Sequence, residues 1–88
     1  MLRNEEFLKG EKIVRSILKK YEEDENKHPW NGDNRHYYLC ASSANVCYDY
    51  ETMVRRGEIY FPSLKEAEKA VEEAGSENVL RYYLKVIR

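Results

Sequence analysis

The chain has 88 residues, and its 15 Lys and Arg against 16 Asp and Glu give a formal net charge of −1. Hydrophobic residues make up 42% and charged residues 35%, which suits one small domain with a heavily charged exterior. This balance excludes a chain-wide positive field that would attract nucleic acid, and the sequence has no apolar run near the roughly 20 residues of a membrane span. We therefore expect one soluble domain over residues 1–88 that does not engage a membrane. It should comprise a helix in 1–24, a loop in 25–35, and a sheet with C-terminal helices in 36–88.

The first predicted element is an amphipathic helix from about residue 3 to residue 23. Its apolar side chains fall near one face, while Lys and Glu lie largely on the other. The apolar positions are Phe7, Val14, Ile17, Leu18 and Tyr21. Their spacing approximates a heptad, but Gly10 occupies the intervening apolar position and weakens a coiled-coil interpretation. We expect the helix to pack on a sheet within a monomer; a homodimer formed through this helix is the alternative.

The polar connection after this helix is predicted to be a loop. Pro29 disfavours helix at His28, and Asn31-Gly32 favours a turn. The connection contains Trp30, the only tryptophan of the chain. A lone tryptophan usually anchors the edge of a small core, whereas an exposed one would anchor a partner. We favour the core edge and keep partner contact as the alternative.

Residues 36–61 are rich in types that favour strands. The predicted strands are residues 36–41, 46–50 and 58–61. We predict that they form an antiparallel meander whose first turn spans 42–45. In that hairpin Cys40 lies opposite Cys47, so a disulfide is within reach under oxidation. Reduced thiols are the expected state, because two cysteines are too few for a disulfide-stabilised secreted domain.

A capped helix and a further helical segment are predicted after the strands. Ser63 can accept a hydrogen bond from the Glu66 N–H in a capping box, and Gly75 favours a left-handed stop. Residues 77–88 suit a helix or a strand, and we choose helix because Ser76 is a good N-cap. The predicted fold class is α+β: an N-terminal helix, a three-stranded antiparallel meander, and one or two C-terminal helices packed on one face.

No constellation in the sequence indicates an enzyme, a metal site or a cofactor. The soft metal ligands are His28, His36, Cys40 and Cys47. Their spacing matches no zinc motif, and a strand would separate His36 from Cys40 by roughly 13 Å, too far for one ion. The plainer interpretation places both histidines on the surface and treats both cysteines as small buried apolar residues. The acidic run at 22–25 is typical of a solvated helix end.

The order of these elements resembles that of small, mostly uncharacterised proteins of bacteriophages and prophages. In those proteins a charged N-terminal helix precedes a Tyr-rich strand pair and a helix with the pattern G-x-x-[YF]-F-x-[ST]-x-x-[ED]-A-E-x-A. The matching residues are Tyr37, Tyr38, Tyr48, Tyr50, Gly57, Tyr60, Phe61, Ser63, Glu66, Ala67, Glu68 and Ala70. The resemblance implies a viral or prophage setting, with the host cell cytoplasm as location, and no particular mechanism.

These observations favour a non-enzymatic interaction protein, a phage-type accessory factor that binds and modulates or inhibits a host or viral protein, for example one in a defence system. Tyrosines suit a compact binder, because they provide large contact area at low entropic cost. The candidate contact residues are Trp30, Tyr50, Arg55 and Arg56. The alternative is a module that stacks single-stranded nucleic acid on a Tyr-bearing sheet with a basic rim. Its candidate residues are Arg35, Tyr37, Tyr48, Tyr60 and Lys85.

Overall fold

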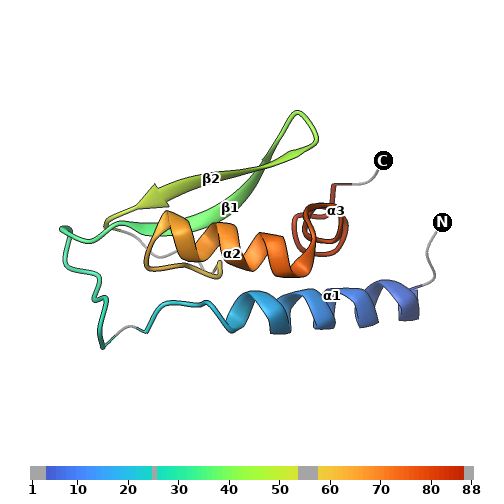
Figure 1. The fold of residues 1–88 in the computed structure, drawn as a ribbon, viewed down its shortest axis with the longest axis horizontal. Helices are drawn as coiled ribbons and strands as arrows, with labels where there is room; N and C mark the ends of the chain where they lie inside the picture. Colours follow the sequence, from blue (N-terminus) through green and yellow to red (C-terminus); the bar gives the residue numbers. More distant parts are fainter. Residues whose placement is uncertain (1–3, 25, 54–57, 87–88) are drawn as a thin grey trace.

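The computed structural model describes residues 4–24, 26–53 and 58–86. Its elements, in chain order, are α1 (Asn4–Lys19), β1 (His36–Ser42), β2 (Asn45–Glu51), α2 (Leu64–Ala74), α3 (Ser76–Asn78) and the π-helical turn η1 (Val79–Tyr83). Figure 1 shows the β1–β2 hairpin on one side and α1 on the other, with α2 packed across both. No helix in the described ranges is long and apolar enough to cross a membrane.

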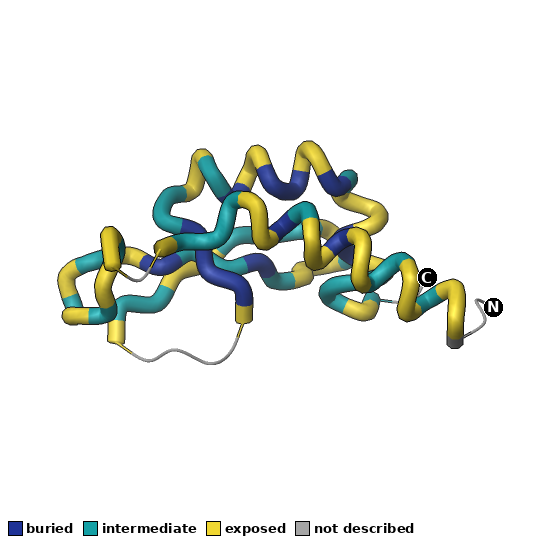
Figure 2. The backbone as a smooth tube through the Cα atoms, turned by 90° about the horizontal axis from the view of Figure 1, so that it is seen from below, coloured by how far each residue is buried: buried dark blue, intermediate teal, exposed yellow. Residues whose placement is uncertain are grey.

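The hydrophobic core lies where α1, α2 and the hairpin meet, and Figure 2 shows buried stretches alternating with exposed ones along α1 and α2. The buried core residues are Val14, Leu18, Leu39, Ile59, Phe61, Ala67, Ala70, Val71, Ala74 and Val79. Three of the four that α2 contributes are alanines, so its backbone can approach its neighbours closely. Much of the core volume therefore comes from the large residues on β1, α1 and the segment before α2.

The prediction of a three-stranded meander is wrong, because the described chain forms a two-stranded sheet. Phe61 makes only an isolated antiparallel bridge to Tyr37, on the edge of β1 that β2 does not use. The backbone of the preceding residues bonds elsewhere: the Tyr60 carbonyl accepts from the Glu23 N–H at 2.8 Å, and the Ile59 N–H donates to the Tyr83 hydroxyl at 3.1 Å. A ladder continued from Phe61 would direct the Ile59 N–H at β1, and this group bonds to Tyr83 instead.

The Ser63 cap and the Gly75 stop of α2 are confirmed, and the C-terminal segment is helical as far as Tyr83. The Ser63 hydroxyl accepts from the Glu66 N–H at 3.3 Å, and Gly75 has φ +90° just after the last residue of α2. The chain then continues as α3 and η1 rather than as a strand. Lys85, with φ +59°, turns the chain out of η1.

The β1–β2 hairpin has the predicted register, with Cys40 opposite Cys47. The structure joins these two cysteines by a disulfide, with Cα atoms 5.1 Å apart, and so differs from the expected pair of free thiols. The turn residues Ser43 and Ala44 have φ values of +49° and +64°. Two consecutive positive φ values are the geometry of the type I′ turns that close two-residue hairpins, where Asn-Gly is the favoured pair.

Helix α1 packs against α2 and η1 rather than mainly on the sheet. Gly10 is the point of closest approach, because a Cβ built there would overlap the Tyr82 ring. The ring also lies beside Phe7, with centroids 5.7 Å apart. The glycine that interrupts the apolar heptad therefore leaves room for the Tyr82 ring, and its role is in packing within this chain.

Replacing Ala44 with Gly is expected to raise the free energy of unfolding by about 0.5–1 kcal/mol. Glycine avoids a steric cost of about 1–2 kcal/mol at positive φ, while its greater freedom in the unfolded chain removes part of the gain. Urea unfolding without reductant measures the change. The matched control is Ala41→Gly at an exposed position of β1, which should lower stability. A loss in both variants would show that the turn stores no steric strain.

Replacing Gly10 with Ala is expected to lower the free energy of unfolding by roughly 1 kcal/mol, because overlap with Tyr82 outweighs the helix propensity that alanine adds. In a Tyr82→Ala background the same change should instead stabilise the protein, by up to about 1 kcal/mol. Urea unfolding of the four proteins gives the coupling between the two positions. Additive effects would contradict the close contact between them.

Candidate functional site

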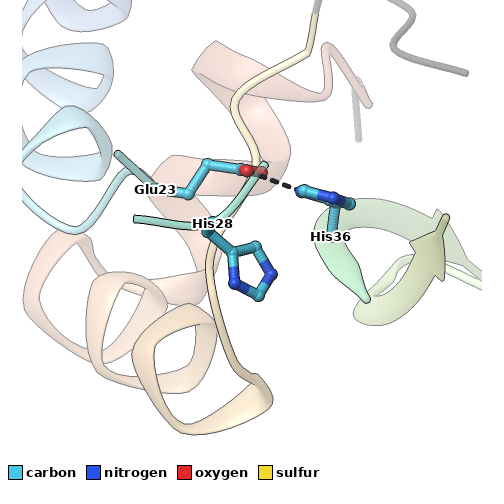
Figure 3. Close-up of side chains that lie close together, drawn as sticks. All are labelled: Glu23, His28 and His36. Carbon is cyan, nitrogen blue, oxygen red and sulfur yellow. Dashed lines mark hydrogen bonds and ion pairs between the residues drawn. The ribbon is translucent and has the colours of Figure 1, made fainter. Parts of the chain in front are cut away.

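Four side chains from separate parts of the chain gather beside the start of β1: Glu23, His28, Trp30 and His36. We call them the histidine cluster. Glu23 follows the end of α1, His28 and Trp30 lie in the connecting loop, and His36 is the first residue of β1. Figure 3 shows Glu23 and His36 facing each other, with the His28 ring beside them.

The centre of the cluster is a buried carboxylate–imidazole pair. Glu23 Oε2 lies 2.5 Å from His36 Nδ1, and the two side chains are only 4% and 0% exposed. In this contact the His36 Nδ1–H donates and the carboxylate oxygen of Glu23 accepts. Burial of such a pair is costly unless both partners are well satisfied, yet Glu23 Oε1 and His36 Nε2 are buried without a hydrogen-bond partner.

Two aromatic side chains enclose His36. Trp30 stacks on it almost parallel, with centroids 3.6 Å apart, and the Tyr60 ring meets Trp30 edge-on at 4.9 Å. The indole Nε1 is also buried without a partner. Trp30 therefore fixes the plane of the imidazole and covers one of its faces with apolar surface.

His28 closes the cluster on the loop side. Its ring lies edge-on to His36, with centroids 4.6 Å apart, and its Nε2 lies 2.7 Å from the Arg35 carbonyl oxygen. Because a carbonyl only accepts, Nε2 carries the hydrogen in this contact. His28 is half-buried and can therefore exchange with solvent more readily than His36.

The sequence analysis missed this cluster for two reasons. It placed both histidines on the surface, which is wrong for the fully buried His36, and it treated Glu23 as part of a solvated acidic run. A histidine beginning a strand, together with a lone nearby tryptophan, was the available signal; the Glu23 contact depends on how the chain returns from α1. The disulfide also ties up Cys40 and Cys47, so neither sulfur offers a thiolate to these histidines.

The candidate contact residues fall in different environments. Trp30 is half-buried against His36, which supports the core-edge interpretation. Tyr50 is 44% exposed, and the guanidinium carbon of Arg35 lies 4.8 Å from the centroid of its ring. Arg55 and Arg56 lie outside the described residues.

Tyr37 joins Tyr50 and Arg35 at this end of the hairpin. The two tyrosine rings are 5.7 Å apart, and a hydrogen bond to Tyr37, helped by the nearby Tyr50 ring, raises the pKa of the Arg35 guanidinium. An arginine guanidinium stays positively charged at physiological pH, so this end of the hairpin carries a positive charge.

The residues of the nucleic-acid alternative do not form one surface. Tyr48 packs partly into the core, and burial raises the pKa of its hydroxyl. Tyr60 is buried, and Lys85 pairs with Glu11 of α1 at 3.4 Å. Only Arg35 and Tyr37 remain together, beside Tyr50.

Replacing Glu23 with Ala, in the presence of a chelator, is expected to lower the free energy of unfolding by about 3 kcal/mol, because it leaves buried His36 without its carboxylate. Urea unfolding followed by Trp30 fluorescence measures the loss, since Trp30 stacks on the affected ring. The neighbouring half-buried Glu22→Ala is the control and should cost much less. Similar losses in both variants would show that the Glu23–His36 pair does not support the fold.

The chain was compared with known proteins at the level of sequence and of structure. No family model, no curated protein and no solved structure matches it. Its function is therefore argued from the contacts of its own residues.

Proposed function

We propose that this chain is a non-enzymatic accessory protein of a bacteriophage or prophage, which works in the host cytoplasm by binding and modulating or inhibiting a host or viral protein. The single observation that supports this proposal concerns the outer edge of β2, the edge that faces away from β1. No described strand pairs with that edge, and Tyr50 and Arg35 lie exposed at one end of it. We call the backbone of Val46, Tyr48 and Tyr50, with the Arg35 and Tyr50 side chains, the open edge.

The hydrogen-bond pattern of the hairpin shows which groups the open edge presents. Tyr37 exchanges both of its backbone bonds with Phe61, at 3.0 and 2.7 Å, on the side of β1 away from β2. Its pairing partner Tyr50 must therefore also direct its backbone groups away from β1, and by alternation Tyr48 and Val46 do the same. Figure 1 shows β2 as the outer strand of the hairpin.

One of these outward groups already has a partner within the chain. The Tyr50 N–H donates to the Asp49 carboxylate at 2.8 Å. Native proteins protect exposed strand edges with charged side chains, because an unprotected edge pairs indiscriminately. Asp49 protects one end of the open edge, and a partner would compete with it there.

The proposed mechanism is occlusion through strand addition. An extended segment of the partner would pair with Val46 and Tyr48, the backbone bonds supplying affinity. The exposed Tyr50 ring and the Arg35 cation would select the segment, because aromatic and arginine side chains dominate interface energetics. An acidic or aromatic residue in the partner would fit the Arg35 and Tyr50 end best.

The partner can be identified by crosslinking in host cells, with a photoreactive phenylalanine analogue in place of Tyr50. The same analogue at the exposed Glu72 of α2 is the control. We expect one protein to be captured from position 50 and not from position 72. Capture of the same proteins from both positions would contradict a partner seated on the open edge.

Replacing Val46 with Pro is expected to weaken binding of that protein at least about tenfold, because proline removes an outward N–H that the hairpin does not use. Val46→Ala is the matched control: it loses the same packing and keeps the N–H. Isothermal titration calorimetry measures both affinities, and circular dichroism checks the fold. Equal affinities of the two variants would exclude strand addition at this edge.

The nucleic-acid alternative leads to a separate expectation. We expect no binding of single-stranded DNA or RNA oligonucleotides at about 50 mM salt, because a protein of balanced charge needs its cations on one surface to bind phosphates. Fluorescence anisotropy measures this directly. Tight binding that weakens steeply with added salt would reverse the choice between the two functions.

A further inference from the structure

The histidine cluster takes no part in the proposed partner binding, and its contacts support a different inference. We infer that Glu23, His28 and His36 form a binding site for one divalent transition-metal ion, with zinc the best match. Each of the three side chains has one metal-binding atom within 4.8 Å of those of the other two. Figure 3 shows the three side chains close together, with Glu23 and His36 facing each other and the His28 ring beside them.

The spacing is close to that of a bound ion. Zinc binds imidazole nitrogen and carboxylate oxygen at about 2.0–2.2 Å, so the ligand atoms of a tetrahedral site lie about 3.4 Å from one another. The ligand atoms here lie within 4.8 Å of one another, at most about 1.4 Å more than this spacing. His28 lies in the loop and is half-buried, so a small movement of its ring can close that difference.

The burial of the cluster supplies an independent argument. Among the described residues, the buried Glu23 Oε1 has no hydrogen-bond partner, and buried polar groups are rarely left unsatisfied. The hydrogen between Glu23 and His36 occupies the position where a cation would meet both side chains. An ion there would compensate the carboxylate charge, and the hydrogen of the His36 ring would move to Nε2.

The surroundings of the three residues match those of metal ligands. A ligating histidine usually has its ring held by a second contact. The Arg35 carbonyl holds His28, and Trp30 holds His36 by stacking while excluding water from one face. Two imidazoles with one carboxylate suit zinc and its first-row neighbours, whereas calcium and magnesium take oxygen ligands.

Such an ion would join three parts of the chain: the exit from α1, the following loop and the start of β1. Three protein ligands leave a fourth position of a tetrahedral ion for water or for a side chain of another molecule. Because a metal that binds only the folded state stabilises it, added zinc should raise the melting temperature.

The test uses the full chain with its disulfide intact, no histidine tag, and prior chelation and dialysis. Competition with a chromogenic chelator measures zinc affinity, and the visible absorption bands of added cobalt report the coordination geometry. We expect one ion per chain, a four-coordinate cobalt spectrum, and a melting temperature that rises with zinc. His28→Gln should weaken zinc binding at least about tenfold while the chain stays folded.

Glu72→Gln, which removes an exposed carboxylate of α2, is the matched control and should bind zinc as the unaltered chain does. Histidine-ring NMR adds a readout that does not need a variant, since both rings should shift with one equivalent of zinc. Absence of stoichiometric binding would overturn the inference and leave a water molecule as the group that satisfies the cluster. Equal affinity of His28→Gln and the unaltered chain would also overturn it.

Discussion

Four hydrogen bonds made by the backbone of the short segment Ile59–Phe61 determine how this chain is assembled. All three residues of the segment are buried, and each bonds to a different part of the fold: Ile59 to η1, Tyr60 to the exit from α1, and Phe61 to β1. Burial raises the pKa of the Tyr83 hydroxyl, which therefore stays protonated while it accepts from Ile59. Without this segment the described helices and the hairpin would share only side-chain contacts.

The predictions succeeded where the signal is local. The turn and register of the hairpin, the Ser63 cap and the left-handed Gly75 all follow from residues near one another in the chain. The third strand was wrongly predicted, because the Ile59 N–H that would extend its pairing with β1 bonds to Tyr83, which lies far away in sequence. No local pattern records such a competition.

In the candidate site, too, features with a local signal were predicted and contacts between residues distant in sequence were not. Exposure of Tyr50 follows from its place at the end of a two-stranded ribbon, and the sequence singled it out. The Glu23–His36 contact was missed, because it depends on the path of the loop between α1 and β1. His36 is a polar residue enclosed by aromatic rings, and burial of that kind is decided by tertiary packing rather than by residue type.

Arg35 connects the two functional features. Its carbonyl accepts from His28 of the histidine cluster, and its guanidinium lies over the Tyr50 ring at the open edge. Any change that reorders the loop around His28 therefore acts on the residue that would select a partner. Arg35 therefore contacts both the histidine cluster and the open edge.

The position of the Cys40–Cys47 disulfide determines how much of the fold depends on an oxidising compartment. The crosslink joins residues only seven apart in sequence, on two strands that already pair with each other. The loop that this disulfide closes is so short that it restricts little of the unfolded ensemble. The buried residues of the core lie outside residues 40–47. Reduction of this disulfide in a reducing compartment would therefore loosen the turn end of the β1–β2 hairpin and leave the helices and their apolar contacts in place.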